Sequence, residues 1–284
     1  MKKIIILLVM VTIALSTVMA QSRGGNQSRT QPPATTFSGQ AFNGATGLYT
    51  IPTGRIGWDR NDFAMDFGYR AIMNDDAGIA HIPSITLSMF KFIELSFAFD
   101  IQPDYNYGSY NNDDFLTGFK LRLPTSSTAI ALGFNMHLIN FDHDDDHNQY
   151  NTFQPYIAIT YPGNFFTMPA ETTITIGKTF YSGKRDNTNI DFGMGFDINL
   201  LPSVFNNVVH LVIDFANYGY SDDAWPGYGG AEWRGVFNVG FRFNLSSIPA
   251  FSKYKFVLDA AFNDILDSGQ RSFTIGAVFG IPLI

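Results

Sequence analysis

The chain has 284 residues, of which 45% are hydrophobic, 15% aromatic and 15% charged, and its formal net charge is −7. An acidic chain without a cluster of basic residues is not expected to bind nucleic acid. The absence of cysteine excludes a fold that depends on disulfide bonds.

The N-terminal residues predict a secretory signal peptide at 1–20. Two lysines precede an apolar run that ends near Leu15, and residues 18–20, VMA, form a small-residue cleavage pattern. The alternative is a retained membrane helix, but the apolar run is short and a polar stretch follows it. Residues 21–43 are rich in Ser, Gln, Gly, Thr and Pro, which predicts a flexible mature N-terminus.

From residue 62 onward, short segments carry apolar residues at every second position. In "IDFGMGFDINL" (190–200), Ile, Phe and Met alternate with Asp, Gly and Asn. Successive side chains of a strand point to opposite faces, so each segment has one apolar face and one polar or small face. We count twelve such strands: 62–70, 85–89, 93–101, 119–123, 130–138, 157–161, 174–180, 190–200, 209–215, 234–243, 255–263 and 273–281.

Loop lengths agree with this alternation at two hairpins. Three residues, 90–92, join two strands whose apolar residues all have odd numbers. Four residues, 124–127, join a strand whose apolar residues have odd numbers to one whose apolar residues have even numbers, as a loop of even length requires. Pro155 does not fit the pattern, because proline cannot donate a hydrogen bond to a neighbouring strand. We therefore expect it near a strand end, at a bulge.

A soluble β-sandwich alternates in the same way, so the connections decide between a sandwich and a barrel. Several linkers are short and carry few charges: 90–92, 124–127, 162–170, 201–206 and 246–252. The others are longer, acidic and rich in Tyr and Asn, notably 102–113, 140–151 and 217–232. Short turns at one end and long loops at the other are typical of outer-membrane barrels.

We therefore predict an all-β fold over residues 44–284: a closed antiparallel transmembrane β-barrel of about 12 strands, with a polar lumen and an apolar exterior that faces lipid. An even number of strands puts both termini on the short-turn side, which is periplasmic for an exported chain. The expected location is the bacterial outer membrane. The expected partners are outer-membrane lipid, the outer-membrane assembly machinery and small hydrophilic solutes.

A short box directly precedes the first strand. Its residues are Gly44, Thr46, Gly47, Leu48, Pro52 and Thr53. The box resembles the start of the YjbH-like outer-membrane barrel proteins, which are associated with exopolysaccharide export, and the resemblance covers residues 44–69. It implies that the box lies in or below the barrel mouth and has no catalytic role. An ordinary lead-in turn rich in Gly and Pro is the alternative.

The residues on the polar faces of the strands predict a lumen in which basic and acidic groups nearly balance. Such charges either pair across a narrow barrel and close it, or line a water-filled pore. The predicted lumen-lining residues are Asp66, Arg70, Glu94, Lys120, Arg122, His137, Asp191, Asp197, His210, Asp214, Arg234, Arg242, Lys255 and Asp259.

These features predict a small passive, porin-like channel for ions or small hydrophilic solutes. The alternative is a closed structural or adhesive barrel that uses its acidic, Tyr- and Asn-rich surface loops. An outer-membrane phospholipase or deacylase would need a Ser–His pair on the lipid-facing parity, and we find none, so we expect neither an enzyme nor a cofactor.

One acidic loop is a weak candidate for a metal site. Asp142, Asp144 and Asp146 begin like a calcium-binding loop, but the glycine at its sixth position and the carboxylate at its twelfth are missing. We therefore expect no resident metal.

Overall fold

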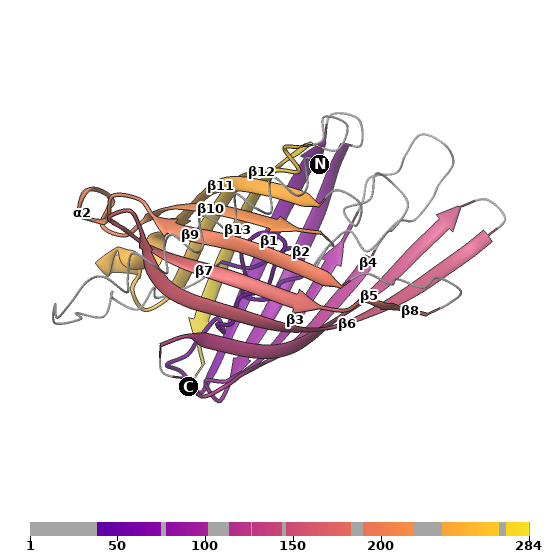
Figure 1. Cartoon of the computed structure of the whole chain (residues 1–284), viewed down its shortest axis with the longest axis horizontal. Coiled ribbons are helices and arrows are strands. Elements are labelled where there is room, and N and C mark those ends of the chain that lie inside the picture. Colours follow the sequence, from indigo (N-terminus) through magenta and orange to yellow (C-terminus); the bar gives the residue numbers. More distant parts are fainter. Residues whose placement is uncertain are drawn as a thin grey trace.

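The computed structural model describes residues 39–74, 78–101, 114–125, 127–143, 146–182, 190–217, 235–266 and 271–283. Most of them belong to one antiparallel sheet (Figure 1). The elements are β1 (Phe63–Asn74), β2 (Gly78–Met89), β3 (Ile93–Asp100), β4 (Asp114–Arg122), β5 (Ala129–His143), β6 (Asp146–Phe165), β7 (Met168–Gly177), β8 (Phe180–Tyr181), β9 (Asp191–Asn199), α2 (Pro202–Phe205), β10 (Val209–Ala216), β11 (Val236–Asn244), η1 (Leu245–Ser247), η2 (Pro249–Phe251), β12 (Lys255–Asn263) and β13 (Ser272–Pro282).

The sheet closes on itself. Strands adjacent in sequence pair with each other, the first strand β1 pairs with the last strand β13, and β5 pairs with both β4 and β6. β7 and β8 both pair with β6 and together form one interrupted strand. The thirteen named strands therefore make a barrel of twelve, which confirms the predicted fold.

Pro155 lies within β6, not at a strand end, and no bulge accommodates it. On one side it is paired with Phe134 of β5. On the other side β7 ends at Gly177, opposite Tyr156, and β8 begins at Phe180, opposite Phe153. Proline has no N–H to donate, so the neighbouring strand is interrupted beside it while the register on either side is kept.

The predicted alternation is visible in burial. Along β10 every second residue is buried, and β3 and β12 show nearly the same pattern. The buried side chains face inward, whereas the outward ones include well-exposed aromatic and aliphatic residues such as Phe67, Ile157 and Phe279. Outward residues of β9 pack with neighbours from β7, β10 and β11 in an apolar cluster that includes Met194 and Phe196.

Two linkers proposed from the sequence are shorter in the structure. The expected long loop 140–151 is largely strand, since β5 continues to His143 and β6 starts at Asp146. The expected linker 162–170 is also mostly strand, because β6 extends to Phe165 and β7 starts at Met168. Backbone pairing does not require apolar side chains, so the hairpins continue beyond the alternating apolar segments that the prediction used. No described helix is long and apolar enough to cross a membrane.

Candidate functional site

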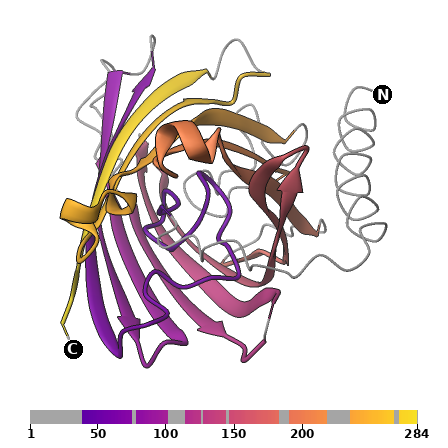
Figure 2. The ribbon, with the colours of Figure 1, turned by 90° about the vertical axis from the view of Figure 1, so that its left-hand side faces the viewer.

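The inside of the barrel is occupied by residues 39–58, which we call the luminal segment. In the view of Figure 2 this indigo stretch lies within the ring of strands. Apart from Arg55, which is half-buried, every residue of the segment is buried. Residues 39–43 of the N-terminus that the sequence predicts to be flexible are thus buried against the barrel wall.

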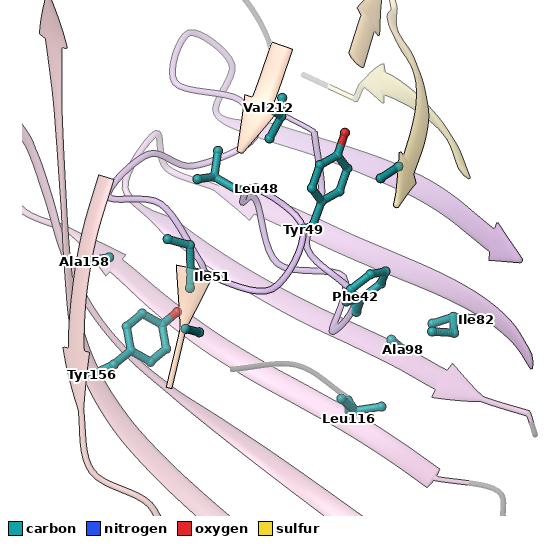
Figure 3. Packing of buried hydrophobic residues seen from close by; sticks show 12 residues of the cluster. Phe42, Leu48, Tyr49, Ile51, Ile82, Ala98, Leu116, Tyr156, Ala158 and Val212 are labelled. Atoms are coloured by element: carbon teal, nitrogen blue, oxygen red, sulfur yellow. The ribbon is translucent and has the colours of Figure 1, made fainter. Parts of the chain in front are cut away.

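Apolar side chains of the segment contact inward-facing residues of several strands. Figure 3 shows Phe42 beside Ile82, and Leu48 and Tyr49 beside Val212. Arg70 and Arg242 also lie over the rings of Phe42 and Tyr49, with the guanidinium carbon 5.5 and 5.7 Å from the ring centroids. Burial raises the pKa of the Tyr49 phenol well above its usual range.

Two carboxylates of the wall accept hydrogen bonds from the segment's backbone. Glu94 of β3 accepts from the amides of Thr46, at 2.8 Å, and Gly57, at 2.9 Å, and from the Thr46 hydroxyl at 2.6 Å. Asp214 of β10 accepts from the amides of Tyr49 and Thr50 at 2.8 and 2.7 Å through one carboxylate oxygen. Two strands that lie more than 100 residues apart in the sequence therefore hold the same segment.

Basic side chains of the wall donate to the segment's carbonyl groups. Lys120 Nζ donates to the carbonyl oxygens of Thr46 and Arg55, both at 2.8 Å. Arg242 donates to those of Gly47 and Leu48 at 3.0 and 3.3 Å. Arg70 donates to the carbonyl oxygens of Gln40 and Ala41. These donors hold the backbone of the segment rather than particular side chains.

Side-chain contacts secure the end of the segment that leads into β1. Arg55 forms an ion pair with Glu171 of β7, and its Nε lies 2.9 Å from that carboxylate. The indole N–H of Trp58 donates to Asp66 at 2.6 Å. Arg55 is the one charged residue among positions 39–58.

The charged groups of the wall also pair with one another. The N···O distances are 2.9 Å for Lys120–Glu94, 2.7 Å for Lys255–Asp66, 2.7 Å for Arg242–Asp259, 3.3 Å for Arg70–Asp259, 2.6 Å for His210–Asp197 and 3.2 Å for His137–Asp114. Each wall cation that contacts the luminal segment therefore also has a wall carboxylate beside it.

Most of the predicted lumen residues lie together on the inner face. Asp66, Arg70, Glu94, Lys120, His137, Asp191, His210, Asp214, Arg242, Lys255 and Asp259 are buried there, and Asp197 is partly buried. Arg122 lies apart from them, near the turns, with Nη1 3.4 Å from Asp59. Arg234 lies outside the described residues.

The weak metal candidate gains no support from the described part of the chain. Asp142 and Asp146 belong to the paired ends of β5 and β6, and Asp144 lies outside the described residues. Among the residues that the structure describes, no group of three or more His, Cys, Asp or Glu could hold a metal ion.

The sequence reasoning missed the luminal segment as a functional element. Its anchors Thr46, Tyr49 and Arg55 were not among the predicted site residues, and neither was Glu171. The signal that could have revealed them is the box itself, which the resemblance placed in or below the barrel mouth.

Charge is distributed unevenly along the barrel axis. Asp100 and Asp114 are paired neighbours at the long-loop ends of β3 and β4, and Asp191 begins β9 at the same end. Lys120 and Lys255 lie near the short turns. The loop end of the described inner face is thus acidic, whereas the turn end contains the mixed ion pairs.

No protein-family model and no curated protein matches the sequence. Solved structures with a similar chain path include the KdgM porin in complex with disordered oligogalacturonate, at 12% identity and a TM-score of 0.46, covering 76% of this chain and 98% of that one. The outer membrane protein Omp33 of Acinetobacter baumannii has 11% identity and a TM-score of 0.43, covering 78% and 98%. LpxR from Salmonella typhimurium has 10% identity and a TM-score of 0.41, covering 76% and 99%.

Proposed function

We propose that this protein is a bacterial outer-membrane barrel that acts as a porin-like channel for ions or small hydrophilic solutes, with both termini in the periplasm. The observation that carries the proposal is the composition of the inner wall. Eleven of the predicted charged or titratable residues are buried there, while the outer wall is apolar. A wall of this kind is stable against lipid outside and compatible with water inside.

The nature of the filling favours a channel over a permanently closed barrel. A barrel that serves only as a rigid support can fill its interior with apolar side chains from its own strands. Here the wall presents ion pairs, and the interior is filled by one continuous segment that precedes β1. Such a segment can be removed from the lumen without changing the wall, whereas side chains that fill a lumen cannot.

We further propose that the chain is related to the YjbH-like barrel proteins through the box at residues 44–53. The likeness of the box supports this, as does its position among inward-facing groups, because the family resemblance implies a place at or within the barrel mouth. Residues 1–20 are proposed to be a signal peptide, and the outer-membrane assembly machinery is the proposed insertion partner.

Single-channel conductance of the refolded chain in a planar bilayer tests the proposed channel. We expect open steps whose size grows with salt concentration, infrequent in the wild type and more frequent in Asp214→Asn, which weakens the hold on the luminal segment. Insertion is checked separately by the resistance of the barrel to protease. If both proteins insert and neither passes current, the channel proposal is refuted and the closed structural barrel takes its place.

A further inference from the structure

We propose that residues 39–58 are a removable plug, that the wall cations which hold it keep a wall carboxylate as partner when it leaves, and that its departure through the short-turn mouth opens the barrel. This inference rests on the proposed channel function.

The segment carries a single charge. A buried charge that loses its partner is costly to leave behind, and an insert that leaves and returns should therefore carry few charges. Arg55 is the one charged residue in the segment. Its other polar contacts with the wall use backbone amides and carbonyls, the Thr46 hydroxyl, the Gln40 and Asn43 side-chain amides, which donate to Thr86 and Asn135, and the indole of Trp58.

The wall keeps most of its ion pairs after the segment has left. Lys120 and Lys255 keep Glu94 and Asp66 as partners, and Arg242 keeps Asp259. Water that enters the lumen can satisfy the remaining donors and acceptors. The vacated wall therefore has paired charges and a polar surface, as a conducting lumen requires.

Two other wall carboxylates make direct contacts with the segment that its departure would break, and we assign them as the latch. Glu171 faces Arg55 and would lose that ion pair. Asp214 would lose both backbone donors and keep the Asn238 amide, which donates to its other oxygen at 2.7 Å. The free energy that holds the segment therefore depends on these two positions, which lie on β7 and β10.

The direction of departure follows from the chain connection. The segment continues through residues 59–62, of which Asp59, Arg60 and Asp62 are exposed, into the turn end of β1. Four residues span at most about 13–14 Å when fully extended. The segment therefore stays attached to the turn end of β1, so it leaves through the mouth of the barrel that bears the short turns.

A reversible covalent lock tests the plug directly. A β-carbon at position 57 would lie 3.2 Å from the Ser88 hydroxyl oxygen, so Gly57→Cys with Ser88→Cys places two thiols within disulfide reach. The chain has no other cysteine. The same preparation is measured oxidised and after reduction, and each single variant serves as its control.

We expect the oxidised double variant to show about tenfold fewer openings than the reduced one, while reduction leaves the single variants unchanged. A disulfide that does not form under oxidation would refute the placement of the segment. Equal conductance of the oxidised and reduced double variant would refute the plug while leaving the channel proposal intact.

Thiol reactivity reports the movement without relying on current. Ile51→Cys places a thiol at a fully buried position of the segment. A membrane-impermeant maleimide should modify this thiol slowly. Adding Asp214→Asn should increase the rate at least about tenfold, whereas Ser252→Cys at an exposed turn should react at the same fast rate in both backgrounds.

The two readouts separate the two proposals. An increase in thiol reactivity in a barrel that stays electrically silent would support movement of the segment and refute the channel. Open steps together with a reactivity that Asp214→Asn does not change would support the channel and refute the plug.

Discussion

Replacement of Asp214 by asparagine should shift the barrel toward its open state, because this carboxylate makes two of the strongest backbone contacts of the luminal segment. Its Oδ2 accepts from the amides of Tyr49 and Thr50 at 2.8 and 2.7 Å, and its Oδ1 accepts from the Asn238 amide. An asparagine amide has the same shape, but its NH2 group must face donors on one side or the other. The substitution therefore removes the charge and creates a mismatch without creating a cavity.

The size of the effect follows from the two backbone hydrogen bonds. A hydrogen bond to a charged group contributes about 1.5–3 kcal/mol, compared with about 0.5–1.5 kcal/mol for a neutral one. Weakening two of them raises the free energy of the closed state relative to the open one by about 2–3 kcal/mol. The ratio of open to closed barrels should then rise roughly 30- to 140-fold, since 1.4 kcal/mol corresponds to a factor of ten.

The assay is the fraction of time that single barrels conduct in a planar bilayer, with Asp191→Asn as the matched control. Asp191 is also a buried carboxylate of the inner face, but its Oδ2 accepts from the wall side chains Gln154, at 2.8 Å, and Thr179, at 2.5 Å. The reasoning is refuted if Asp191→Asn opens the barrel as much as Asp214→Asn, or if Asp214→Asn leaves the open fraction at the wild-type value.

The remaining predictions concern the second latch, the packing of the segment and ion preference. Glu171→Gln removes the ion-pair partner of Arg55 and should raise the open fraction less than Asp214→Asn, about fivefold, because this pair is partly exposed. Gly68→Ala adds a β-carbon that collides with the Gln40 side chain, so the maleimide reactivity of a thiol at position 51 should rise; unchanged reactivity would contradict the described packing. The open channel should prefer cations, because the inner face is acidic at the end that bears the long loops. The double variant Asp100→Asn with Asp114→Asn should move the reversal potential in a salt gradient toward zero. An unchanged reversal potential would place the selective region elsewhere.

The barrel was predictable because alternation and parity are local properties of the sequence. A strand that carries Val, Leu or Phe at every second position has only one way to face lipid, and β10 and β12 show the predicted burial. Strand ends were harder to predict. The hairpin of β5 and β6 continues through polar residues such as Asn148, since backbone pairing is indifferent to their polarity.

The luminal segment was much less predictable. Its composition of Gly, Thr, Asn and Pro is that of a loop. Nothing in its own sequence indicates that its backbone will form hydrogen bonds with wall residues that lie 29–195 positions later in the chain. The Gly47 carbonyl, for example, accepts a hydrogen bond from Arg242, 195 positions along the chain. Side chains such as Arg242 could be placed on the inner face from parity, but their partners could not.

These long sequence separations have a consequence for the order in which the molecule is assembled. Bonds that join the segment to Glu94, Asp214 and Arg242 span separations of 48, 165 and 195 residues. Such distant contacts form slowly and late, because the intervening chain must be ordered before they can form. The pocket that receives the segment exists only once β3, β10 and β11 have taken their places in the ring. The first stretch of the described chain is therefore the last to reach its final position, and its seating marks the completion of the barrel.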